Sequence, residues 1–229
     1  MDKRLIIIIV FAIVASLSVR AQKLGFVGGP SVTYGALTAT DAEATLTPVP
    51  MAGLHVGMQF EMDVTNRWGF DAQVMYLLRT YRWNLTYPET TPHRMERLAG
   101  FLDVPFHFYV NFPQKQNHLV LTLFGGPVFT CGLHAHDWAY ERTQLRRPIT
   151  EMDELLYDTD KGHIVRCYIE AEVGLALKYK NYQGRVSYQH SINNGTNNLY
   201  LYTLPLAKSP YFTTGDLRFS FVYLFDLRK

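Results

Sequence analysis

A short run of histidines holds the residues of this chain whose types and spacing could do chemistry. In the sequence HAHD, His134 and His136 are two residues apart and Asp137 follows directly. Residues two apart share a face of an extended strand, so both imidazoles are expected to point the same way, near His163 on the next strand. Three histidines are enough ligands for a metal such as zinc. An imidazole beside a carboxylate could also act in acid–base catalysis, as in an enzyme with its active site at the rim of the fold.

We favour a simpler interpretation, in which these histidines are ordinary polar residues at that rim. Cys131 and Cys167 lie on the same two segments, but their position in the alternation is opposite to that of the histidines. The sequence does not decide whether the two cysteines form a disulfide, because that depends on the register of the strands. The sequence therefore predicts no catalytic residue, no bound metal and no cofactor, with His134, His136 and His163 as the remaining candidates for a metal site.

The elements that carry these residues are strands. In GLHVGMQFEM, residues 53–62, apolar residues alternate with glycine and polar residues at a period of two. Eight strands are expected from this pattern, near 23–37, 53–62, 67–82, 98–112, 118–134, 164–179, 184–192 and 211–227. Most exceed the roughly 5–6 residues of a typical soluble strand, and they are long enough to cross a bilayer at the tilt of a barrel.

The first 21 residues are typical of a secretory signal peptide. Lys3 and Arg4 precede the apolar run LIIIIVFAIV, and a small residue, Ala21, ends the segment. We expect cleavage after Ala21, which leaves 22–229 as the barrel domain. Removing the three basic and one acidic residues of this segment from the 22 and 20 of the whole chain leaves 19 of each sign. This balance gives no electrostatic footprint for nucleic acid.

Short and long connections alternate between the expected strands. Short turns are expected at 64–67, 113–117 and 180–184, and longer loops at 38–52, 83–97, 135–162 and 193–210. This alternation is the plan of a bacterial outer-membrane barrel. The predicted fold class is therefore all-β: an eight-stranded antiparallel up-and-down transmembrane β-barrel with short periplasmic turns and longer extracellular loops, in the outer membrane of a Gram-negative bacterium. The alternative is a soluble barrel of the lipocalin type, whose apolar residues face inward.

Charged residues occupy the alternate strand positions that would face the barrel interior. The predicted lumen network consists of Glu61, Asp71, Arg166, Glu170, Glu172, Arg185, Asp216 and Arg218. Charged side chains at the depth of the bilayer are tolerated only if they are paired or hydrated. The interior of an eight-stranded barrel is small enough for side chains to fill. We expect these residues to form a salt-bridged plug.

Two strands contain the same interruption, Gly-Gly-Pro. It occurs as Gly28, Gly29 and Pro30 and again, 97 residues later, as Gly125, Gly126 and Pro127. Glycine weakens a strand and proline lacks a ladder donor, so we predict a bulge or kink at each site, where the barrel wall bends. The offset also suggests that two four-stranded halves arose by duplication.

The chain resembles the PorT-like outer-membrane β-barrel proteins of Bacteroidota. The resemblance depends on the signal peptide, the Gly-Gly-Pro strand at 125–127, FLDVPFHFYV at 101–110 and the closing strand FSFVYLF at 219–225. It implies a non-enzymatic structural or accessory component that supports protein secretion of the type IX kind. Its expected partners are outer-membrane lipid, the barrel insertion machinery and secretion-system proteins. The alternative is a binding or adhesion protein that acts through loop 135–162.

Overall fold

The computed structural model describes residues 23–38, 45–86, 93–113, 119–140, 146–149, 167–192 and 211–227. Within these ranges, eight long strands form the barrel wall. They are β1 (Lys23–Thr38), β3 (Met51–Asp63), β4 (Trp68–Thr86), β5 (His93–Pro113), β6 (Leu119–Tyr140), β8 (Cys167–Tyr179), β9 (Tyr182–Ser191) and β10 (Tyr211–Asp226). Two shorter strands, β2 (Thr45–Val49) and β7 (Arg146–Ile149), add to this wall. The predicted signal peptide, 1–21, and the loop 193–210 lie outside the described residues.

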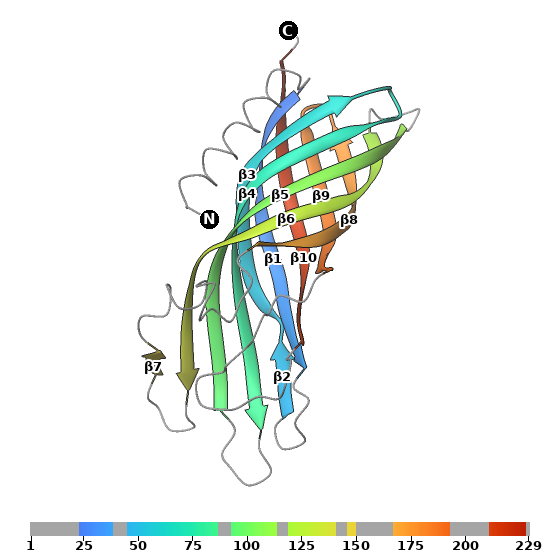
Figure 1. The fold of residues 1–229 in the computed structure, drawn as a ribbon. Helices are drawn as coiled ribbons and strands as arrows, with labels where there is room; N and C mark the ends of the chain where they lie inside the picture. The colour runs from blue at the N-terminus through green and yellow to red at the C-terminus, as the bar shows by residue number, and fades with distance from the viewer. Residues whose placement is uncertain are drawn as a thin grey trace.

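The eight long strands close into a ring in which every neighbouring pair is antiparallel. Around the ring the order is β1, β3, β4, β5, β6, β8, β9 and β10, and the first and last strands close it with a ladder from Lys23↔Asp226 to Thr38↔Tyr211. Strand β2 pairs with β4 just beyond the part that pairs with β3, so β2 continues the line of β3 past Pro50. The predicted eight-stranded antiparallel up-and-down barrel is confirmed (Figure 1).

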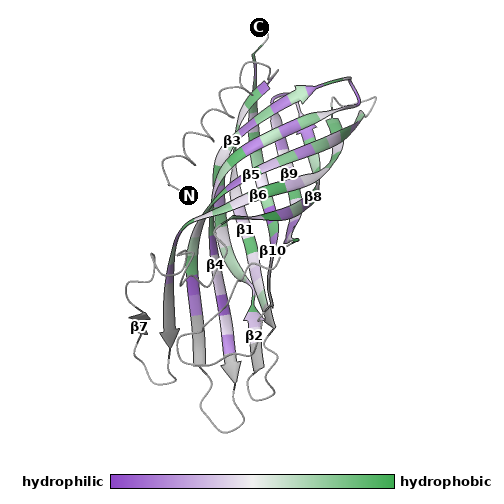
Figure 2. Ribbon diagram, in the orientation of Figure 1, coloured by the Kyte–Doolittle hydropathy of each residue, from purple (hydrophilic) through white to green (hydrophobic). Residues whose placement is uncertain are grey.

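The barrel carries its apolar residues on the outside. Leu54 and Val56 on β3 are each 61% exposed, whereas His55, between them, is 3% exposed. Hydrophobic and hydrophilic residues alternate along the strands in the same way (Figure 2). A water-soluble barrel buries the apolar residues of its strands in the interior, so this distribution excludes the lipocalin-type alternative. No helix among the described residues is long and apolar enough to cross a membrane.

On the long-loop side, three adjacent strands extend well beyond β8 and β9, and β2 continues beside β4 as far as Thr45↔Thr86. Strands β4, β5 and β6 have 19, 21 and 22 residues, against 13 and 10 for β8 and β9. Figure 1 shows them, with β7, reaching past the end of β8 and β9. The extension is held from inside, because the Tyr81 ring stacks on Trp83, and Trp83 Nε1 donates to the Gly35 carbonyl at 2.8 Å.

This extension corrects the predicted loop boundaries. Strand β4 runs to Thr86 and β5 begins at His93, so most of the expected loop 83–97 is strand. The last six residues of β6, which ends at Tyr140, and all of β7 lie within the expected loop 135–162. Strand β2 lies within the expected loop 38–52. The turn expected at 64–67 is confirmed, because β3 ends at Asp63 and β4 begins at Trp68.

Both Gly-Gly-Pro sites interrupt a ladder without adding a residue. On β1, Gly28 pairs with Phe221 and Ser31 with Arg218, and the two positions between them are unpaired with β10. On β6, Gly125 pairs with Phe108 and Val128 with Pro105, with the same two-residue gap toward β5. The register is the same before and after each gap, so the bulge predicted as one form of these sites is wrong. Each proline lies in the gap, where no donor is needed.

Candidate functional site

The lumen is crossed by three side chains that meet from three different strands. Arg79 from β4 donates through Nη2 to Glu170 Oε2 on β8 at 2.8 Å and through Nε to Asp216 Oδ2 on β10 at 2.5 Å. All three side chains have no solvent-exposed surface. We call Arg79, Glu170 and Asp216 the upper cluster, because it lies toward the long-loop end.

Neighbouring side chains satisfy the remaining polar atoms of the upper cluster. Arg79 Nη1 donates to the Tyr168 hydroxyl at 2.8 Å. Four further side chains donate to the two carboxylates: Thr33 to Asp216, and Thr130, Thr214 and Gln189 to Glu170. Buried charges are tolerated when they are both paired and hydrogen-bonded, and the upper cluster meets both conditions.

A second group of charges lies one layer toward the short-turn end. Arg218 Nη2 donates to Asp103 Oδ2 at 2.6 Å, while its Nη1 lies 3.6 Å from Glu172 Oε2. His107 Nε2 lies 3.4 Å from the same Glu172 oxygen, and His107 Nδ1 lies 2.9 Å from Asp71 Oδ1. The contacts to Glu172 are therefore longer than those of the upper cluster.

Further pairs lie at the short-turn end of the lumen. Arg185 Nη1 donates to the Gln59 side-chain oxygen at 2.8 Å and lies 3.5 Å from Asp71. Glu61 accepts from Lys178 at 3.0 Å and from Lys23 at 3.1 Å. Together the three layers connect charges of opposite sign along the described length of the lumen.

The structure brings together most of the residues that the sequence assigned to the lumen. Glu61, Asp71, Glu170, Glu172, Arg185, Asp216 and Arg218 all lie in these layers and are buried. Arg166 lies outside the described residues. Sequence reasoning missed Arg79, although counting in twos from Asp71 along β4 places it on the inward face.

The two candidate metal ligands on β6 face away from the lumen. The register between β5 and β6 shifts by one residue at Leu133, because Phe101 pairs with Gly132 and Gly100 with His134. One extra residue reverses the inside–outside alternation beyond it. His134 therefore lies on the outer face, where its Nε2 is 2.9 Å from the hydroxyl of the exposed Tyr76.

The expectation that the histidines oppose the cysteines is therefore wrong. His136 shares the outer face and is exposed, with its ring 6.0 Å from that of His134. His163 lies outside the described residues. Among the residues that the structure describes, no group of three or more histidine, cysteine, aspartate or glutamate side chains is arranged to hold a metal ion.

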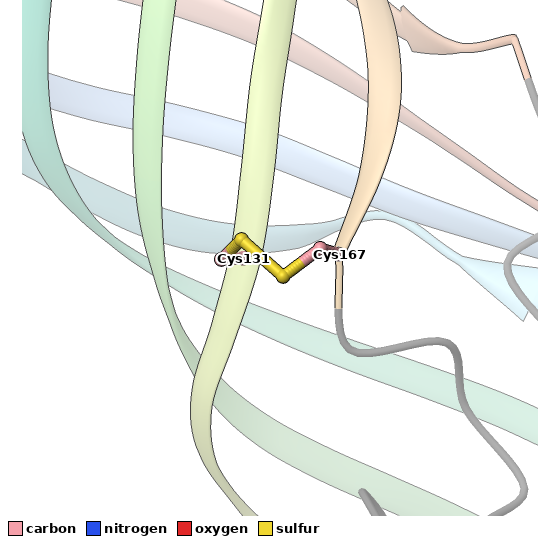
Figure 3. Close-up of a disulfide and its surroundings, with 2 residues drawn as sticks. All are labelled: Cys131 and Cys167. Carbon is pink, nitrogen blue, oxygen red and sulfur yellow. A yellow bond between two sulfur atoms is a disulfide. The ribbon is translucent and has the colours of Figure 1, made fainter. Parts of the chain in front are cut away.

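Cys131 and Cys167 form a disulfide across β6 and β8 (Figure 3). The two residues are direct partners in the ladder, with their Cα atoms 4.2 Å apart, and they form its last pair toward the long loops. The bond therefore closes the ladder at the point where β6 continues beyond the end of β8. It resolves the alternative that the sequence left open.

A closed antiparallel barrel with apolar residues outside and paired charges inside is a transmembrane barrel of the outer membrane. The family model described as outer membrane protein beta-barrel domain matches residues 14–200. The chain belongs to this family, and it is an outer-membrane protein. No curated protein matches it.

Three solved structures can be aligned with this chain over most of its length. OprG from Pseudomonas aeruginosa is 9% identical, with a TM-score of 0.47, covering 90% of this chain and 97% of OprG. Ail, the attachment invasion locus protein of Yersinia pestis, solved with the heparin analogue sucrose octasulfate, is 11% identical, with a TM-score of 0.40 and coverage of 89% and 98%. LpxR from Salmonella typhimurium is 7% identical, with a TM-score of 0.30 and coverage of 89% and 100%.

Proposed function

We propose that this barrel is a non-enzymatic structural or accessory component of the outer membrane, with a closed lumen, that supports protein secretion. The observation that carries the proposal is the upper cluster. Arg79, Glu170 and Asp216 reach across the lumen from three strands and leave no exposed surface. An eight-stranded barrel has little interior to spare, so such a cluster favours a rigid body over a channel.

The type IX secretion role comes from the resemblance to PorT-like proteins, and the geometry is compatible with it. A rigid barrel with β4, β5 and β6 extended on one side offers a fixed surface at the extracellular end. Secretion-system proteins, the barrel insertion machinery and outer-membrane lipid are the partners that this proposal names.

Binding of an extracellular ligand is the second candidate function. It is favoured by the β6–β7 ladder, in which residues 137–140 pair with β7 within the segment 135–162. The segment thus begins with a pair of antiparallel strands, one of which is the end of β6, the longest strand of the wall. An enzyme with His134, His136 and Asp137 at its rim is supported less, because both imidazoles face outward.

The two candidates are separated in a strain that lacks this gene. We expect the deletion strain to lose secreted proteins from the culture medium, and wild-type protein to restore them. A variant lacking 141–158 keeps β6 whole and should restore secretion as well, once its assembly is verified by heat-dependent gel mobility. Unchanged secretion in the deletion strain would refute the secretion role, and loss of cell-surface binding in the 141–158 variant alone would favour the binding function.

A further inference from the structure

Each Gly-Gly-Pro site lies under a polar contact that crosses the strand. On β1, Gly29 pairs with His55 of β3 and stands opposite Ser220 of β10 in the gap of that ladder. His55 Nε2 reaches over the glycine to Ser220 Oγ at 2.8 Å. A side chain on one neighbouring strand is thus joined to a side chain on the other.

The second site repeats this arrangement. On β6, Gly126 pairs with Glu172 of β8 and stands opposite His107 of β5 in the gap of that ladder. Glu172 Oε2 lies 3.4 Å from His107 Nε2, again across the glycine. Strands β1 and β6 are four steps apart in either direction around the eight-strand ring, so the two contacts lie on opposite walls of the lumen.

Only glycine fits at the centre of each contact. A β-carbon on Gly29 would lie 2.0 Å from the Phe219 carbonyl oxygen, and one on Gly126 would lie 2.0 Å from that of Phe106. The adjacent strand therefore approaches closely at both sites.

Several polar atoms in this layer make no hydrogen bond with the described residues, although Glu172 Oε2 has His107 Nε2 at 3.4 Å and Arg218 Nη1 at 3.6 Å. On the donor side these are Nε and Nη1 of Arg218, and on the acceptor side Oδ1 of Asp103, Oε2 of Glu172 and Oε1 of Gln189. His55 Nδ1 and His107 Nε2 also make no hydrogen bond with the described residues. All six side chains are at least nine-tenths buried, and leaving such atoms unpaired is costly.

We propose that the layer between the two contacts is a binding site for ordered water. Donors and acceptors are both left over, so the occupant must accept from Arg218 and donate to Glu172 and Asp103. A metal cation cannot accept a hydrogen bond from Arg218, and an anion without a proton cannot donate one to the two carboxylates. Water satisfies both kinds of atom and commonly occupies such buried polar sites.

The site is tested by hydroxyl-radical footprinting of the folded protein in detergent micelles. Synchrotron pulses generate radicals from bound as well as bulk water, and mass spectrometry measures oxidation at each side chain. After correction for intrinsic reactivity, His55 and His107 should be oxidised at least about fivefold faster than the equally buried Leu77, which has no polar atom to hold water. Tyr168, hydrogen-bonded in the upper cluster, serves as a second buried reference.

A pair of substitutions tests whether the water is shared between the two walls. His55→Phe fills part of the layer, and we expect it to lower oxidation of His107 at least about twofold. The matched variant His190→Phe changes a histidine next to Tyr188 on the outer face and should leave His107 unchanged. If His55→Phe fails to assemble, the wild-type rates decide.

The outcomes separate this proposal from the closed lumen. Oxidation of His55 and His107 no faster than that of Leu77 would show a dry layer and overturn the water site. Oxidation of Tyr168 as fast as that of the histidines would show an open, wet lumen, which overturns both the localised site and the closed barrel.

Discussion

Replacing Arg79 by methionine removes the positive charge that holds two buried carboxylates together. Methionine keeps most of the length of the side chain but donates no hydrogen bond to Glu170 or Asp216. Removing one partner of a buried ion pair costs about 3–5 kcal/mol. Thr130 and Thr214 still donate to Glu170, which limits the effect on that carboxylate. We therefore expect the free energy of unfolding to fall by about 4 kcal/mol, less than the cost of two broken pairs.

The assay is urea unfolding of protein refolded into lipid vesicles, followed by the fraction that keeps its heat-modifiable gel mobility. Lys23→Met is the control, because Lys23 forms ion pairs near the short turns with 28% of its side chain exposed. It should lose less than about 1 kcal/mol. Adding Glu170→Gln and Asp216→Asn to Arg79→Met should recover more than half of the loss. Equal losses for Arg79→Met and Lys23→Met would refute the reasoning.

Three further perturbations follow from the same structure. Gly126→Ala places a β-carbon 2.0 Å from a backbone oxygen and should abolish the folded gel band. Gly184→Ala is the control: a β-carbon there has nothing within 4 Å, so the free energy of unfolding should change by less than about 0.5 kcal/mol. A folded Gly126→Ala protein would contradict the close approach of the strands. Cys131→Ser, Cys167→Ser and the double variant should each lose the same amount, about 3 kcal/mol under oxidising conditions, and additive losses would show that the cysteines act separately. Val56→Arg, on the lipid-facing surface, should cost about 2–4 kcal/mol in vesicles; no cost would place Val56 outside the bilayer.

Alternation of residue types was enough to predict most of the fold. It identified the eight strands and, from the charged parity, the inward position of Glu170 and Asp216. The same rule applied to β4 would have found Arg79. Which charges pair could not be predicted, because the upper cluster joins β4, β8 and β10, and those contacts depend on the register of the closed ring.

Two features had no reliable sign in the sequence. The extra residue at Leu133 looks like any other strand residue, yet it turns His134 and His136 from the inner face to the outer face. The extension of β4 and β5 past the expected loop boundary contains Trp83, which donates to the carbonyl of Gly35. Such contacts between distant segments stabilise strand structure where local composition favours a loop.

The closed lumen is tested most directly by conductance across a planar lipid bilayer. Purified wild-type protein, with its insertion verified by gel mobility after recovery, should give no sustained ion current, because Arg79, Glu170 and Asp216 block the passage. Stable, stepwise openings from the wild-type protein would contradict the account and identify the barrel as a channel.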